Sequence, residues 1–329
     1  VLERALLAQS IVVTGAQVML ARAEDGRVSL AFDAGLADSG AAPSLPGVLA
    51  ALDAATDQPT LAALEEVRAE GLVVNYTDAR AGQAWTVDGG ALSVLFGRSD
   101  LEISADMAVL SGRPEPTSIS LRYVSPRGDP SATLSLSVDD AVAADLATQS
   151  AALSWLGVLD APLSASLRGV VDATGALGQM SATLQIGAGA LRPSADARPV
   201  RFDSASAYLG YDPAAGTIDF DRIAVAAPGV GLDASGRAYL RDMSGGMPGE
   251  IWGQFEIAHL LAGDGGPLPV PLDLSEGTAD LKLKLSPFRL TFDGVRGRLA
   301  SSGAGAVAAG QDSPCLLYTS DAADDPNLG

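Results

Sequence analysis

Hydrophobic and polar residues alternate along much of this chain, most regularly in residues 280–292. Leucines occupy every second position of residues 281–285, with lysines between them, and the alternation resumes at Phe288. Because successive side chains of a β-strand point to opposite faces, each run has one apolar and one polar face. The pattern predicts strands whose apolar face must pack against another apolar surface.

Similar stretches recur through the chain, separated mostly by Gly, Asp, Asn or Pro. Their number and spacing predict a mainly β protein built as a long antiparallel meander, as in a sandwich, a barrel or an extended sheet. Turns are predicted at EDGR (24–27), VDGG (87–90), DATGA (172–176), DPAAGT (212–217) and LDASGR (232–237).

Two short helices are predicted among the strands. The first covers residues 44–59, with Ser44 as its N-cap, and the second covers residues 139–162, starting at Asp139 or Asp140. Two helices of this length cannot cover the apolar faces of a dozen strands.

Charge and aromatic content exclude some functions. The chain has 329 residues, and 40 acidic against 21 basic side chains give a net charge of −19. Such a surface repels phosphate backbones, so we expect no nucleic-acid partner, and it disfavours broad adhesion to anionic membranes. Aromatic residues make up only 5% of the chain, which is low for a base-stacking surface.

Residues for catalysis or metal binding are scarce. The single cysteine, Cys315, excludes an intramolecular disulfide, and one histidine, His259, with one cysteine is too few for a zinc site. A Ser-His-Asp triad would have to use His259, for which a structural role is favoured. Residues 229–234 fit the dinucleotide pattern G-x-G-x-x-A, but a strand is predicted after them instead of the required helix. We therefore predict no enzyme activity, catalytic residue, cofactor or metal.

The remaining charged residues on predicted strands have two interpretations. Asp219 and Asp221 could act as paired carboxylates in a β-helix hydrolase or bind calcium, although a solvated strand face is favoured. Arg122, Arg237 and Arg241 lie on polar sides of strands and are expected to form surface ion pairs.

No linker interrupts the turn-rich pattern, so residues 1–312 are expected to belong to one elongated β-domain without an internal boundary. Residues 313–329 depart from the pattern. The stretch CLLYTSDAADD (315–325) resembles a translated transposase sequencing adapter. We expect residues 313–329 to be a non-native, disordered tail on a metagenomic fragment; the alternative is a natural acidic tail.

Four stretches carry a resemblance to a known family: residues 10–33, residues 66–96 with VNYTDARAGQAW at their centre, residues 159–191, and residues 214–240. In strand rhythm and turn placement they resemble the AsmA-like proteins of Gram-negative bacteria, the YhdP type in particular. The resemblance covers about residues 1–300 and includes no catalytic motif. The family's N-terminal membrane helix is not in this sequence, which truncation would explain.

This resemblance implies a long curled antiparallel β-sheet with about two short helices, enclosing an apolar groove. It implies a periplasmic protein anchored to the inner membrane that carries phospholipids toward the outer membrane, with acyl chains as the groove's partner. The oligomeric state stays open. The residues predicted to line the groove are Leu72, Val74, Tyr76, Leu134, Leu136, Val138, Leu281, Leu283 and Leu285.

Two alternatives remain besides the hydrolase. One is a TamB-like structural or assembly β-groove that handles client protein strands by edge pairing. The other is a closed β-sandwich that serves as an interaction module. The first predicts bound client peptide instead of lipid, and the second predicts a tightly packed, lipid-free interior.

Overall fold

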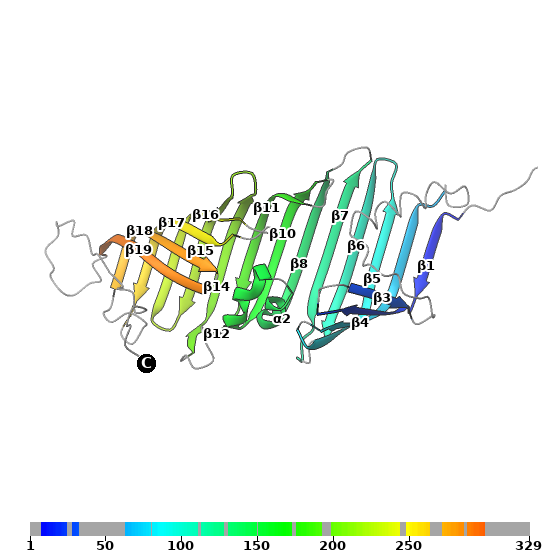
Figure 1. The fold of residues 1–329 in the computed structure, drawn as a ribbon, viewed down its shortest axis with the longest axis horizontal. Coiled ribbons are helices and arrows are strands. Elements are labelled where there is room, and N and C mark those ends of the chain that lie inside the picture. The colour runs from blue at the N-terminus through cyan, green and yellow to red at the C-terminus, as the bar shows by residue number, and fades with distance from the viewer. Residues whose placement is uncertain are drawn as a thin grey trace, which may run out of the picture. The chain divides into compact units, whose positions relative to one another are not determined.

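The computed structural model describes residues 8–24, 28–32, 63–79, 81–110, 113–127, 131–149, 151–172, 176–192, 199–243, 248–263, 272–285 and 288–299. The predicted helix at 44–59 and the tail from residue 313 lie outside these residues. The protein is mainly β and its sheet is mostly antiparallel, as predicted (Figure 1). The curling of that sheet into a groove stays a prediction.

The chain forms two compact units, one comprising Val1–Leu184 and Leu191–Arg198, the other Gln185–Ala190 and Pro199–Gly329. The strands in residues 1–186 are β1 (Ser10–Thr14), β2 (Gln17–Arg22), β3 (Val28–Phe32), β4 (Glu66–Asp78), β5 (Gln83–Phe96), β6 (Asp100–Leu110), β7 (Thr117–Pro126), β8 (Ala132–Val142), β9 (Leu159–Asp160), β10 (Pro162–Val171) and β11 (Leu177–Ile186). The later strands are β12 (Gly189–Leu191), β13 (Val200–Phe202), β14 (Ser204–Asp212), β15 (Thr217–Ala227), β16 (Val230–Arg241), β17 (Glu250–Ala262), β18 (Leu272–Leu285) and β19 (Phe288–Leu299).

The sheet of the first unit has the order β11-β10-β8-β7-β6-β5-β4-β2-β3. Its N-terminal end departs from a simple meander, because β1 and β2 both pair with β4 in parallel. Residues 10–22 therefore form two strands, β1 and β2, instead of one continuous strand. Gly15, at φ +67°, divides the segment, and its N–H donates to the carbonyl of Glu70 at 2.9 Å.

A line of glycines explains this break. Gly71 on β4 and Gly89 on β5 also have positive φ, and the register shifts between Ala69 and Leu72 and between Val87 and Ala91. Only glycine adopts this conformation without a steric cost from Cβ. Three neighbouring stretches thus change direction or register at glycines that the sequence places 56 and 18 residues apart.

The second unit contains a regular antiparallel meander in the order β14-β15-β16-β17-β18-β19. Each strand pairs with the next along the chain. The G-x-G-x-x-A match at residues 229–234 opens β16, a strand, so the helix that a dinucleotide site requires is not there.

The turn predictions were partly right. DATGA connects β10 to β11, and DPAAGT connects β14 to β15. VDGG, however, is a bulge inside β5, and LDASGR lies in the middle of β16. In EDGR only Glu24 is described, although β2 and β3 form the predicted antiparallel hairpin around it. Asp and Gly mark bulges and strand interiors as well as turns, and the sequence alone does not separate these roles.

The second predicted helix is shorter and interrupted. It consists of α2 (Ala143–Ala147) and the 3₁₀ segment η1 (Ala151–Val158). Asp139 and Asp140 belong to the end of β8, where the N–H of Asp140 donates to Ser164 Oγ at 3.1 Å. The Thr148 hydroxyl donates to the Asp145 carbonyl at 2.7 Å, which favours the end of α2 after five residues.

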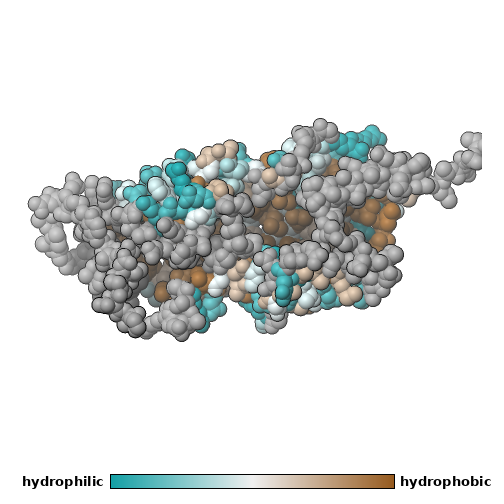
Figure 2. Space-filling model, viewed as in Figure 1, coloured by the Kyte–Doolittle hydropathy of each residue, from teal (hydrophilic) through white to brown (hydrophobic). Residues whose placement is uncertain are grey.

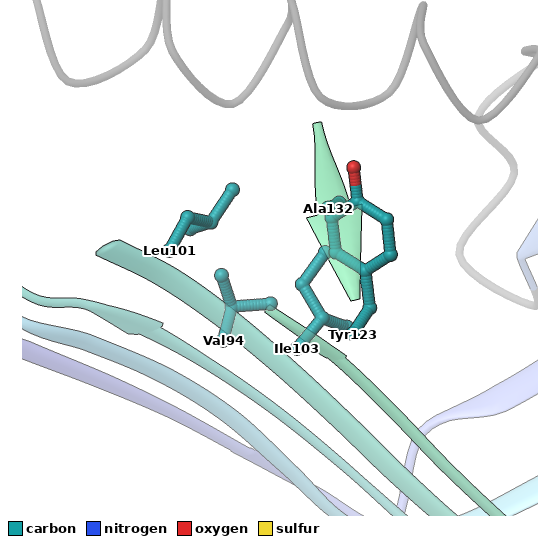
Figure 3. Packing of buried hydrophobic residues seen from close by; sticks show 5 residues of the cluster. All are labelled: Val94, Leu101, Ile103, Tyr123 and Ala132. Carbon is teal, nitrogen blue, oxygen red and sulfur yellow. The ribbon is translucent and has the colours of Figure 1, made fainter. Parts of the chain in front are cut away.

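The hydrophobic core of the first unit is small. Val94, Leu101, Ile103, Tyr123 and Ala132, from β5, β6, β7 and β8, form one buried cluster (Figure 3). Each is at most 9% exposed. This cluster occupies one end of the apolar face of the sheet.

Candidate functional site

The first unit has two rows of apolar residues across the middle of its sheet, which we call the central apolar rows. The strand registers align the members of each row on one face. One row consists of Leu92, Ala105, Leu121, Leu136 and Leu167, and the next consists of Met107, Ile119, Val138 and Ala165.

These rows are apolar but are not sealed from solvent. Leu92 is 38% exposed, Ala105 is the only buried member, and the others are half-buried. Figure 2 shows exposed hydrophobic surface in the region where Figure 1, in the same view, shows β8 and β10. An apolar surface of this kind inside a β-unit marks a candidate binding surface.

The opposite face of the same strands is rich in serine. Arg122 forms two hydrogen bonds to Glu102, at 2.8 and 3.0 Å, and these hold the pKa of the Glu102 carboxyl below its usual value. The seven serines on this face are Ser93, Ser104, Ser118, Ser120, Ser135, Ser137 and Ser166. The sheet therefore has a serine-rich polar face that contacts water, and its leucines lie on the opposite face.

Three of the predicted groove residues lie on this apolar face of β8. Leu136 and Val138 belong to the central apolar rows, and Leu134 packs against the buried cluster. All three are half-buried. Sequence alternation identified them, but not the register that aligns them with residues of β7 and β10.

The predicted residues of β4 have different surroundings. Val74 is opposite Val87, Tyr76 is opposite Trp85, and Leu72 is opposite Gly90. All three predicted residues are half-buried. The rings of Tyr76 and Trp85 are stacked with centroids 5.5 Å apart, so this end of the face is filled by aromatic contacts.

A buried polar cluster lies beside these rings. Asp78 is fully buried, and its carboxylate lies 3.3 Å from Arg22 Nη1 and accepts hydrogen bonds from the Tyr76 hydroxyl at 3.1 Å and the Ala81 N–H at 3.2 Å. Burial raises the pKa of the Tyr76 phenol. An ionised carboxylate tolerates burial only with such partners.

This cluster also fixes the helical segment. Arg22 Nη1 donates to the Gln149 carbonyl at 3.1 Å, and Trp85 Nε1 donates to the Asp145 carboxylate at 3.1 Å. Asp78 and Trp85 are prominent in the sequence stretch VNYTDARAGQAW, but Arg22, 56 residues before Asp78, is not recognisable there as a partner. We interpret the cluster as structural, since its groups satisfy one another.

The predicted groove residues of β18 belong to the second unit. Leu281 is opposite Gly253, Leu283 is opposite Ile251, and both leucines are half-buried. The side chain of Leu285 lies outside the described part of the structure. Phe255 covers neighbouring glycines on this face, because a Cβ added at Gly253 or at Gly236 would collide with it.

The paired carboxylates do not form an evident reaction centre. Asp219 pairs with Arg237 on β16, and Asp221 falls in a bulge where it has no register partner on β14 or β16. His259 Nε2 lies 3.3 Å from the Asp273 carboxylate, in a pair that is half-exposed on the histidine side. Within the described residues, no three metal-ligating side chains gather, and no helix is long and apolar enough to cross a membrane.

Comparisons with protein-family models, with curated proteins and with solved structures found no significant match for this chain.

Proposed function

We propose that this protein is a non-enzymatic lipid-transfer segment whose apolar sheet face shields phospholipid acyl chains between the inner and outer membranes. In this proposal the sheet curls into an open groove. The protein is periplasmic, of the AsmA-like type, and is held at the inner membrane by an anchor that lies outside these 329 residues.

The observation that carries the proposal is the partial exposure of the central apolar rows. Leucine side chains on the inner face of a closed sandwich are normally buried, because a second sheet packs on them. Here Leu121, Leu136 and Leu167 form a continuous stripe across three strands and stay half-buried. An apolar guest on this stripe would complete their burial.

The dimensions and energies suit an acyl chain. The row from Leu92 to Leu167 crosses five strands, and strands lie about 4.8 Å apart, so it is about 19 Å long. One leaflet of a bilayer has a hydrocarbon depth of about 15 Å. Each methylene removed from water contributes about 0.8 kcal/mol, so tails with roughly thirty methylenes need about 24 kcal/mol of shielding. The row is thus long enough for one tail.

The decisive test is lipid extraction from the purified protein followed by mass spectrometry. We expect phospholipid in the wild type and a several-fold reduction in Leu136→Asp, which places a charge in the central apolar rows. Ser135→Asp is the matched control, because it adds the same charge to the same strand on the polar face, between Arg122 and Arg168. Leu283→Asp tests the predicted groove of the second unit in the same way.

Lipid-free wild-type protein, or equal loss in Leu136→Asp and Ser135→Asp, would contradict the proposal. Circular dichroism and urea unfolding of both variants establish that each is folded. A wild type that is lipid-free and protects the amides of β6, β7 and β8 strongly from hydrogen exchange would favour a closed interaction module.

One observation favours the client-strand alternative. All five residues of β1 are exposed, including Ile11 (36%), Val12 (55%) and Val13 (44%), and the only described strand that pairs with β1 is β4. An exposed apolar edge strand is a template for adding another strand. In this alternative Val12→Lys abolishes capture of an extended client peptide and leaves bound lipid unchanged.

A further inference from the structure

The only histidine of the chain, His259, lies on β17 where the pairing of β17 with β18 is interrupted. The two strands pair up to Ile257 and again from Leu260 onward, with no pair described between these points. Residues 272–274, the start of β18, therefore join β17 through a separate stretch of three pairs. A strand end that is held by so few pairs opens more easily than the middle of a sheet.

Carboxylates face His259 from both neighbouring strands. On β16, Asp233 is directly opposite His259 in the register. On β18, the Asp273 carboxylate lies 3.3 Å from His259 Nε2, and Glu276 lies in the interrupted stretch. On β17 itself, the nearest charged residue is Glu256. The imidazole is thus surrounded by acidic side chains on three strands.

Asp233 and Asp273 differ in their other contacts. Arg222 donates to Asp233 Oδ2 at 2.7 Å, and the hydrogen bonds from Arg222, with a smaller contribution from the charge of His259, lower the pKa of the Asp233 carboxyl. Asp273 Oδ1 is buried and accepts no hydrogen bond from the part of the chain that the structure describes. The contact of Asp273 with His259 is therefore electrostatic, and it is attractive only while the imidazole is charged.

From this geometry we propose that His259 is a pH-dependent clamp on the start of β18. The protonated imidazole attracts Asp273 and holds residues 272–274 against β17, whereas the neutral imidazole does not. Histidine changes its charge between about pH 5 and pH 8. Because the charged form makes the contact, its stabilisation is present at acid pH and is lost as the pH rises through this range.

The clamp concerns a strand end that carries a buried apolar residue. Leu274 is 2% exposed and belongs to this end, so opening of residues 272–274 exposes its side chain. This inference goes beyond the proposed function and does not depend on it, because it concerns strand pairing within the second unit and involves neither lipid nor the central apolar rows.

Amide hydrogen exchange of the full chain, corrected for the intrinsic effect of pH on exchange, tests the clamp. We expect the protection of residues 272–274, relative to that of β7, to fall about threefold between about pH 5.5 and pH 8, which is the size expected for a partly exposed ion pair. His259→Gln and Asp273→Asn should each remove this fall. The Hε1 resonance of His259, the only imidazole signal of the chain, should titrate over the same pH interval as the protection.

Asp280→Asn is the matched control, because it removes a carboxylate from the same strand at a position opposite Gln254, away from His259. It should keep the threefold fall of the wild type. A pH dependence that persists in His259→Gln, or that disappears equally in Asp280→Asn, would overturn the inference. Protection of residues 272–274 that does not change with pH in the wild type would overturn it as well, whether or not the variants fold.

Discussion

The two units build their apolar faces from different side chains. In the first unit the central apolar rows are mostly long aliphatic residues that stay half-buried. In the second unit the corresponding face also carries half-buried aliphatic residues, such as Leu232, Ile251 and Leu281, but glycines, alanines and phenylalanine lie between them. Its buried members are Ala234, Ala238, Gly253, Ile257, Ala262, Leu274 and Ala279.

A phenylalanine covers part of the second unit's apolar face. Phe255 covers Gly236 and Gly253, and its ring centre lies 5.7 Å from that of Phe220. A large ring over glycines buries apolar area without any second layer. The comparison teaches that alternation alone does not fix whether a sheet face stays open, since the sizes of cross-strand neighbours decide it.

The largest effect is expected from the buried polar cluster of the first unit. Asp78→Ala leaves Arg22 without its carboxylate in a largely buried position, and removing one partner of a buried pair costs about 3–5 kcal/mol. Urea unfolding should show this loss. Asp219→Ala, at an exposed pair of the second unit, should cost less than about 1 kcal/mol. Equal losses would contradict the structural role of the cluster.

The contrast between the two apolar faces predicts the next effect. Phe255→Ala removes the ring that covers two glycines and should cost about 2–3 kcal/mol, less than for a fully buried phenylalanine because Phe255 is half-buried. Leu136→Ala in lipid-free protein should cost about 1 kcal/mol, because its site is already partly hydrated. If urea unfolding shows a larger loss of unfolding free energy for Leu136→Ala than for Phe255→Ala, then the apolar face of the first unit is the more tightly packed of the two.

The glycines with positive φ, Gly15, Gly71 and Gly89, predict a smaller effect on folding stability, through backbone strain. At Gly89, φ is +72° and no atom lies within 4 Å of an added Cβ, so Gly89→Ala tests conformational strain alone. We expect a loss of about 1–2 kcal/mol in thermal unfolding. Gly231→Ala, in β16 with ordinary φ and a nearest atom at 3.8 Å, should change stability by less than about 0.5 kcal/mol. A neutral Gly89→Ala would argue against a strained bulge.

The smallest effect is a pH dependence in the second unit. Hydrogen bonds from Arg222 lower the pKa of the Asp233 carboxyl, so folding stability from this pair is present above the unfolded pKa and is lost as pH falls through the folded value. Both side chains are exposed, so screening by solvent keeps the effect small. Stability curves of wild type and Arg222→Gln should differ at pH 7 and converge as pH falls through the folded pKa of Asp233.

The sequence by itself determined the β class, the one-faced strands and the turns at residues 172–176 and 212–217. These features follow from local rules, namely alternation with period two and the backbone preferences of Asp and Gly. It also placed Leu134, Leu136 and Val138 together on one strand face, and it marked Asp78 and Trp85 without indicating what they bind.

Only the tertiary structure decided which residues meet across the sheet. It paired β1 and β2 in parallel with β4, turned VDGG into a bulge, brought Arg22 to Asp78, and placed Arg241 over Trp252 instead of a carboxylate. The parallel pairing with β4 and the contact of Arg22 with Asp78 join residues about 56 positions apart, and the other two outcomes depend on the register between consecutive strands. Local pattern specifies the faces of a strand, whereas register and partner choice are set by the packing of the whole sheet.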